Sequence, residues 1–258
     1  PMSSAIWSCP ENEILTFPAK NLLTFFKNHQ LINFFVRPKW RTVKGGSIQY
    51  VKKVIKLLKQ NSNNKLLLNT KITSISSKSK KIKIKYNQSY ETFNKIIMAT
   101  HPDQTLKLIK DLDKKSTKIL SKFQYQKNTV FLHSDPSTMP INTKTWSSWN
   151  YLSSKKGKSS ITYWMNKLQD LNTSLNLFVS LNPFKMPKKS LIHKKIIYEH
   201  PIFNNNTNEA QNLMNEIQGK NNIYYTGAWL GYGFHEDGIS SAIQVAKYFD
   251  VKLPWKIK

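Results

Sequence analysis

The residues with the clearest capacity for chemistry lie in one glycine-rich stretch near the C-terminus, Gly227–Gly238, which reads G-A-W-L-G-Y-G-F-H-E-D-G. His235 carries an imidazole, which titrates near neutrality and can exchange a proton with a ligand. Gly238 has no side chain, so the backbone can approach a flat ligand closely at that residue. The stretch therefore combines a group for proton transfer with a place for close backbone contact.

Two regular elements are needed to position this stretch. Ile223–Thr226 is β-branched and aromatic, which predicts a strand. From Asp237-Gly238 the apolar residues recur at helical spacing as far as Phe249, which predicts a helix. The N–H groups in the first turn of such a helix lack intrahelical partners and favour an electron-rich acceptor. Two interpretations remain open: an ordinary connection between a strand and a helix, or a cofactor site.

The stretch Gly227–Gly238 resembles the C-terminal signature of a bacterial branch of the flavin-containing amine oxidase superfamily, whose members are FAD/NAD-binding oxidoreductases. The segments 37–47, 99–104 and 162–169 resemble other parts of these proteins, in order along the whole chain. The resemblance implies an FAD-dependent oxidoreductase in which a C–H or C–N bond of the substrate loses hydride to the flavin. It leaves the substrate open among an amine, a fatty acyl chain and a polyene.

The resemblance also implies which residues contact the cofactor. Gly45-Gly46 matches a glycine pair near the flavin, although a simple turn explains the pair equally well. The residue that matches Ile72 gives main-chain contacts to the adenine, and Ala99 ends a strand that returns beneath the cofactor. The expected FAD-binding residues are Gly45, Gly46, Ile72, Ala99, Gly227, Ala228, Gly231, Asp237, Gly238 and Ile239.

Tyr232 and His235 are the expected residues on the substrate side of the flavin. Distant relatives place an aromatic residue just ahead of the final helix, where it helps to wall the substrate. A neutral imidazole at His235 could accept a proton as hydride leaves, which would make His235 catalytic. In the alternative interpretation His235 only hydrogen-bonds the loop and keeps Phe234 packed.

One part of a flavin site is missing from the sequence. An enzyme of this class holds the pyrophosphate on a Gly-x-Gly-x-x-Gly turn, and an acidic residue about twenty positions later binds the ribose. No glycines in the chain have this spacing. We therefore expect the chain to be the C-terminal part of a longer enzyme, to retain no FAD at useful affinity and to be inactive alone.

The net charge of +26 favours association with polyanions. Arginine, the usual residue for bidentate contacts with phosphates and bases, occurs only at Arg37 and Arg41, and the lysines are scattered. Nucleic acid is therefore the less favoured partner, and peripheral contact with an anionic membrane is the more favoured one. The rival functional class is a basic, non-catalytic module that binds anionic lipid or nucleic acid. The oligomeric state stays open.

Cys9 is the only cysteine in 258 residues, which excludes an internal disulfide and a cysteine-based zinc cluster. We expect no metal site and a reducing compartment, so the expected location is the cytoplasm, with peripheral membrane contact. An apolar content of 39% is enough for a packed core. No apolar run is long enough to cross a bilayer.

The remaining segments predict an α+β fold, in which an incomplete FAD/NAD(P)-binding, Rossmann-like domain is interleaved with a substrate domain. The substrate domain is expected over 1–45 and 103–205, and the FAD-binding domain over 46–102 and 206–258. Short β-rich runs in the second part of the substrate domain predict a mostly antiparallel sheet with helices. On that sheet Trp149 and Trp164 either wall a cavity for a small or lipid-like substrate or pack in the core.

Individual elements are also predicted. Helices are expected at 19–28, from Ser47 as N-cap to Gln60, and at 209–218. A strand at 66–68 and 72–75 should pair with 81–86 as a hairpin added to a parallel sheet. Irregular chain is expected over 1–16 and 204–208.

Overall fold

The computed structural model describes residues 2–7, 14–15, 17–32, 41–77, 81–153, 159–251, 253 and 255. Cys9, the turn at 78–80 and residues 37–40 of the family resemblance lie outside the described residues. The chain divides into two compact units: unit 1 comprises Pro1–Leu66 and Gln126–His200, and unit 2 comprises Leu67–Tyr125 and Pro201–Lys258. The units do not share the boundaries of the expected domains, and what each of them binds stays a prediction.

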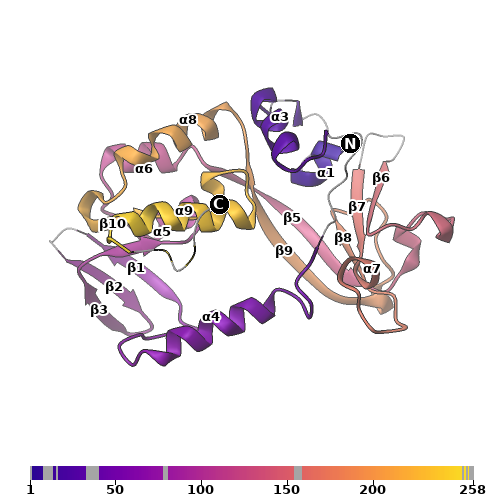
Figure 1. Ribbon diagram of the computed structural model, residues 1–258, viewed down its shortest axis with the longest axis horizontal. Helices are drawn as coiled ribbons and strands as arrows, with labels where there is room; N and C mark the ends of the chain where they lie inside the picture. Colours follow the sequence, from indigo (N-terminus) through magenta and orange to yellow (C-terminus); the bar gives the residue numbers. More distant parts are fainter. Residues whose placement is uncertain are drawn as a thin grey trace. The chain divides into compact units, whose positions relative to one another are not determined.

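Unit 1 is built on a five-stranded sheet with the order β6-β7-β8-β5-β9 (Figure 1). The strands are β5 (Gln124–His133), β6 (Trp149–Ser153), β7 (Ser159–Trp164), β8 (Phe178–Leu181) and β9 (Ile192–Ile202). The pairs β5–β8, β6–β7 and β7–β8 are antiparallel, as the sequence predicts. One face of the sheet buries Val130, Ile161 and Leu181, which face one another across three strands because they are direct partners in the register.

The described residues of unit 1 include the α-helices α1 (Met2–Trp7), α3 (Ala19–Asn28), α4 (Ile48–Gln60) and α7 (Met165–Gln169). The structure confirms α3 and α4, although Ser47 makes no side-chain capping bond. The expectation of irregular chain at the start was wrong, because residues 2–7 form α1. This short helix brings the Trp7 ring to 4.6 Å from Phe17 and 4.8 Å from Phe25, and such ring contacts stabilise a helix that has little propensity of its own.

The part of unit 2 that the structure describes holds two separate sheets. The first is antiparallel, with the order β1 (Ile72–Ser76), β2 (Ile82–Tyr86) and β3 (Ser89–Phe93). The second is a parallel pair of β4 (Ile96–Met98) and β10 (Ile223–Tyr225). The predicted hairpin of β1 with β2 is therefore present, but it continues into β3 rather than joining the parallel strands. Leu66–Leu68 forms no strand, and all three leucines are exposed.

The helices of unit 2 are α5 (Pro102–Leu108), α6 (Lys114–Leu120), α8 (Asn205–Leu213) and α9 (His235–Lys247). The loop predicted at 204–208 is wrong: α8 begins at Asn205, because the Asn204 side chain accepts a hydrogen bond from the Thr207 N–H at 3.0 Å and caps the helix. One hydrophobic core joins α5, α6 and α8 to both sheets. Its largest fully buried members are Tyr225, Ile82, Ile109, Leu120, Ile217 and Ile223.

Candidate functional site

The site predicted from the glycine-rich stretch begins at the carboxyl ends of the two parallel strands. Tyr225 pairs with Met98, so the residues that follow β10 and β4 emerge at the same edge. The Thr226 N–H donates to the Met98 oxygen at 3.0 Å, which brings Thr226-Gly227 beside Ala99. This edge is where open α/β sheets commonly bind ligands.

Ser241 fastens α9 to this edge. Its hydroxyl donates to the Gly238 oxygen at 2.7 Å, accepts from the Gly227 N–H at 3.0 Å and lies 2.7 Å from the Thr226 hydroxyl. Ser241 is 8% exposed, so this network is shielded from water. The second turn of α9 is thereby held against the loop that leaves β10.

Two glycines of the loop are explained by contacts inside the protein. A Cβ atom at Gly227 would lie 2.6 Å from Cδ1 of Trp229, whose ring is buried. A Cβ atom at Gly231 would lie 2.7 Å from Cβ of Asp237. Real Cβ atoms do not approach other atoms so closely, so both positions need glycine for the loop to close on itself.

Gly233 and Asp237 then direct the chain into α9. Gly233 has a φ of 94°, a conformation that residues with side chains rarely adopt. The Asp237 carboxylate accepts a hydrogen bond from the Phe234 N–H at 2.9 Å, so it caps the helix that begins at His235. The helix thus begins two residues before the predicted Asp237.

Gly238 differs from the other glycines because nothing in the described protein requires it. It lies inside α9, where its N–H donates to the Phe234 oxygen at 3.1 Å. A Cβ atom there would meet only Ala228, at 3.9 and 4.0 Å, which is ordinary van der Waals contact. Glycine inside a helix costs about 1 kcal/mol relative to alanine. The internal packing therefore leaves this cost unexplained.

The side chains around Gly238 face outward. His235 is exposed, Tyr232 is half-buried, and Ile239 is 44% exposed although it lies one position after Gly238. The first turn of α9 carries two acidic residues, Glu236 and Asp237. Negative charge at a helix N-terminus already offsets the dipole, so this end suits a neutral acceptor such as a ring carbonyl better than a phosphate.

Two glutamines that the sequence did not single out hold the backbone of the site by hydrogen bonds from their side chains. The Gln211 amide donates to the oxygens of Trp229 and Gly231 at 2.9 and 2.8 Å. The Gln218 amide accepts from the Tyr225 N–H at 2.8 Å and donates to the Tyr225 oxygen at 2.7 Å. Gln218 therefore occupies the outer edge of β10 in the way a neighbouring strand would, whereas no strand lies along the outer edge of β4 in the described part of the chain.

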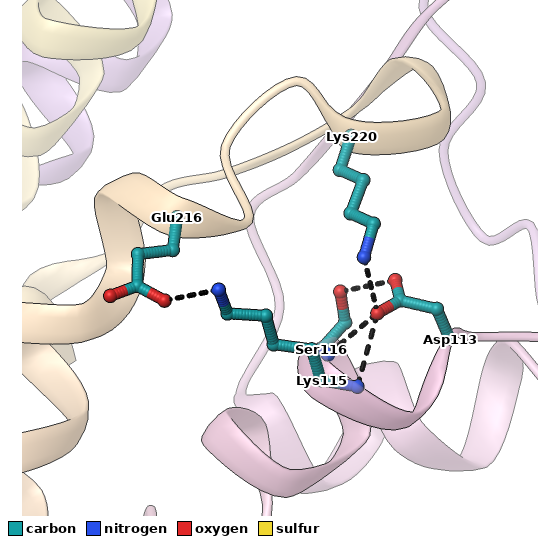
Figure 2. Close-up of polar contacts among 5 residues, drawn as sticks. All are labelled: Asp113, Lys115, Ser116, Glu216 and Lys220. Carbon is teal, nitrogen blue, oxygen red and sulfur yellow. Dashed lines mark hydrogen bonds and ion pairs between the residues drawn. The ribbon is translucent and has the colours of Figure 1, made fainter.

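A charged cluster fixes the segment that enters β10 (Figure 2). The Asp113 carboxylate accepts hydrogen bonds from the N–H groups of Lys115 and Ser116, from the Ser116 hydroxyl at 2.7 Å and from Nζ of Lys220 at 2.7 Å. Burial raises the pKa of Asp113, but the bonds from Lys220 and Ser116 outweigh it and lower the pKa to about 2. Lys115 also pairs with Glu216. Because Lys220 begins the short 3-10 turn Lys220–Asn222 that leads into the strand, the cluster ties the entry to β10 to the start of α6.

Three other predicted site residues belong to other elements of the chain. Ile72 is the first residue of β1 in unit 2 and is 39% exposed. Gly45 and Gly46 belong to unit 1, where φ values of 77° and 81° place them in a turn before α4. The turn alone accounts for both glycines. Their contact with a cofactor stays a prediction.

Trp149 and Trp164 do not share a face of the sheet in unit 1. Trp149 pairs directly with Tyr163, and the two rings lie 5.3 Å apart. Since successive residues of a strand point to opposite faces, Trp164 lies on the other face, where it contacts Trp146 at 5.4 Å. A single cavity on one face cannot use both tryptophans, and the 49% exposure of Trp149 makes it the more accessible of the two to a ligand.

Unit 1 also contains a buried histidine that the sequence did not reveal as special. The fully buried His133 accepts the Asp135 N–H at Nδ1, at 3.1 Å, so its proton lies on Nε2 and is donated to Ser180 Oγ at 2.8 Å. Ser180 in turn lies 2.7 Å from the Thr162 hydroxyl. Burial lowers the pKa of His133 to about 4, although the Asp135 charge acts in the opposite direction. This neutral imidazole links β5, β8 and β7.

Two other kinds of site are absent from the described residues. No group of three or more His, Cys, Asp or Glu side chains there could hold a metal ion. No described helix is both long and apolar enough to cross a membrane.

The fold is similar to that of known amine oxidases. A putrescine oxidase determined with putrescine bound matches with a TM-score of 0.54 and 8% identity, over 81% of this chain and 54% of the oxidase. Cyclohexylamine oxidase from Brevibacterium oxydans matches with a TM-score of 0.52 and 11% identity, over 80% of this chain and 53% of that one. A fatty acid isomerase from P. acnes has a TM-score of 0.48, which is too low to support an argument.

These similarities concern the fold alone, because the sequence identities are low. The chain spans about half the length of the amine oxidase structures that it matches. No protein-family model matches the chain, and no curated protein matches it.

Proposed function

We propose that this chain is part of an FAD-dependent oxidoreductase and that the flavin ring lies against the N-terminal turn of α9. The observation that carries the proposal is Gly238, a helical glycine that internal packing does not require. A flat ring stacked on the helix start would explain it, because a side chain at 238 would hold the ring away. The amine-oxidase fold of the neighbours supports the same assignment.

The residues of the glycine loop fit such a ring. Gly238 allows the backbone to approach, and the N–H groups at the start of α9 can donate to carbonyl oxygens of the ring, where negative charge gathers on reduction. The two acidic residues in this turn disfavour a phosphate at the same place. Ser241 and Asp237 keep the turn in position whether or not a ligand is bound.

The pyrophosphate must be held by another segment, because no Gly-x-Gly-x-x-Gly turn occurs in the chain. We infer that this segment is a strand–turn–helix unit and that its strand pairs with the outer edge of β4. Parallel sheets are normally covered and consist of more than two strands, and the other outer edge, that of β10, is already occupied by Gln218. The complete enzyme is this chain together with that segment.

Bound FAD would supply a two-electron acceptor for the hydride of a substrate C–H bond, which in an amine is the C–H bond on the carbon next to the nitrogen. The residues of this chain would orient the substrate and move its proton. The exposed His235 lies three residues before Gly238 and could take that proton in the neutral form, while Tyr232 would wall the substrate. Trp149 and its partner Tyr163 offer an apolar surface in unit 1. The substrate class is an amine, a fatty acyl chain or a polyene.

Replacing Gly238 in the complete enzyme tests the proposal. Gly238→Val should remove most bound flavin while the far-UV circular dichroism stays close to that of the parent. Gln244→Val, at an exposed position of the same helix, is the matched control, because it introduces the same β-branched side chain away from the glycine loop. Unchanged flavin content in Gly238→Val would show that the ring does not lie at this turn.

The chain by itself offers a second test. It should not bind FAD tightly, since the pyrophosphate and ribose contacts lie in the other segment. Stoichiometric FAD binding by these 258 residues alone would mean that the cofactor site is built differently.

A further inference from the structure

We propose that α4 binds the surface of an anionic phospholipid membrane, with its axis in the plane of the bilayer. The inference does not depend on the flavin, because α4 belongs to unit 1 and contains none of the residues of the glycine loop. It gives a definite place to the peripheral membrane contact that the composition suggests.

The helix is segregated into two sides. At 3.6 residues per turn, one side carries only apolar residues, and the other carries only lysine and glutamine. The apolar side consists of Ile48, Tyr50, Val51, Val54, Ile55, Leu57 and Leu58. Such strict segregation is typical of a helix that lies at a boundary between an apolar and an aqueous phase.

The apolar side of α4 is not buried by unit 1, the unit to which the helix belongs. No side chain of α4 is buried among the described residues. Val54 is 51% exposed, Leu57 is 64% exposed and Leu58 is 40% exposed, and Val54 and Leu58 lie at the middle of the apolar side. A surface helix of a globular protein normally buries this stripe, so the exposed stripe of α4 is available to another apolar phase.

The charges on α4 identify that phase as an anionic lipid surface. Lys52 and Lys59 border the apolar side on one flank and Lys53 borders it on the other, and all are exposed. From these borders the flexible stems can bring the ammonium groups to the level of lipid phosphates while the apolar side enters the acyl boundary. No acidic residue occurs between Glu13 and Glu91, so nothing in this part of the sequence opposes an anionic surface.

The same charges disfavour a second copy of α4 as the occupant. Two such helices packed by their apolar sides would bring the bordering lysines of both helices together, with no acidic residue on either helix to pair with them. The length of 13 residues is also too short for a helix that crosses the bilayer. Binding in the plane of the surface is the geometry that fits both observations.

Flotation of the full chain with vesicles tests the proposal. We expect binding to vesicles of phosphatidylcholine mixed with phosphatidylglycerol, little binding to phosphatidylcholine alone, and weaker binding at high salt. Changing Lys52, Lys53, Lys56 and Lys59 to Gln should weaken binding at least tenfold, since one lysine near the surface contributes about fivefold. Changing Val54 and Leu58 to Ser should weaken it as strongly.

Matched variants outside α4 control for total charge and for exposed apolar area. The charge control removes the same four positive charges from other exposed positions by changing Lys144, Lys185, Lys189 and Lys194 to Gln. The apolar control removes two other exposed aliphatic side chains by changing Ile141 and Leu175 to Ser. These controls should bind almost as the parent does. Light scattering of every variant in the absence of lipid reports the oligomeric state.

Three results would overturn the proposal. The first is a failure of the parent chain to float with anionic vesicles. The second is an equal loss of binding in the control lysine set and the α4 set, which would show that the net charge of the chain, and not α4, binds lipid. The third is a change of Val54 and Leu58 to Ser that leaves vesicle binding intact or dissociates a dimer instead, which would make the apolar side a protein interface.

Discussion

Gly238→Ala should raise the stability of the chain and lower its affinity for flavin at the same time. The stabilising part follows from the helix: alanine is favoured over glycine by up to about 1 kcal/mol inside a helix, and the new methyl group would meet only Ala228 at 3.9–4.0 Å. A gain of this size raises the midpoint of thermal unfolding by about 2–4 °C for a chain of this size class. No other glycine of the loop should behave in this way.

The loss of flavin affinity follows from the proposed stacking. A methyl group inserted into a close-packed contact typically costs about 1–3 kcal/mol, which corresponds to roughly a 5- to 150-fold weaker affinity for FAD. Differential scanning fluorimetry of the chain and FAD titration of the complete enzyme measure the two effects separately.

Gly227→Ala is the matched control. Its methyl group would lie 2.6 Å from Cδ1 of the buried Trp229 ring, so we expect destabilisation by about 1–3 kcal/mol. The reasoning about Gly238 is refuted if Gly238→Ala destabilises the chain, because the helix would then need glycine for its own packing. It is also refuted if the complete enzyme with Gly238→Ala binds FAD as tightly as the parent does.

Three further predictions concern other residues. In the complete enzyme, His235→Gln should bind FAD normally but slow flavin reduction by about 10²–10⁴-fold; an unchanged rate of reduction would show that His235 has only a structural role. Folding lowers the pKa of His133 from 6.5 to about 4, so between these pH values the unfolded chain binds one more proton than the folded chain. The free energy of unfolding should therefore drop by up to about 3 kcal/mol as the pH falls from 6.5 to about 4. In urea titrations at several pH values, His133→Gln should reduce this dependence of the free energy of unfolding on pH. Asp113→Ala removes the cap of α6 and the partner of Lys220, so it should cost about 1–2 kcal/mol. Glu209→Ala should cost clearly less, because the bond of Glu209 to Lys122 lies at the surface; equal losses would mean that the Asp113 cluster does not hold β10.

The local parts of the site could be predicted from the sequence because their causes are local. The β-branched and aromatic pattern of Ile223–Thr226 predicts β10, and the helical spacing of apolar residues after Asp237 predicts α9. The start of α9 was placed two residues late, because the cap depends on Asp237 turning back to the Phe234 N–H. The glycines were noticed, but the reasons for Gly227 and Gly231 lie in contacts with Trp229 and Asp237 that only a folded loop creates.

The supporting contacts could not be predicted, because they join residues far apart in the sequence. Lys220 meets Asp113 across 107 positions, and Gln211 reaches the Gly231 oxygen from another helix. The opposite faces of Trp149 and Trp164 follow from the register of β6 and β7, which no propensity of single residues specifies. α4 was predicted as a helix, but its uncovered apolar side became visible only in the structure.

The visible absorbance of the purified complete enzyme tests the central claim most directly. We expect a yellow protein with one flavin per chain, and we expect the colour to be lost in Gly238→Val and kept in Gln244→Val. A colourless complete enzyme that also takes up no FAD on titration would contradict the assignment of this chain to a flavin-dependent oxidoreductase.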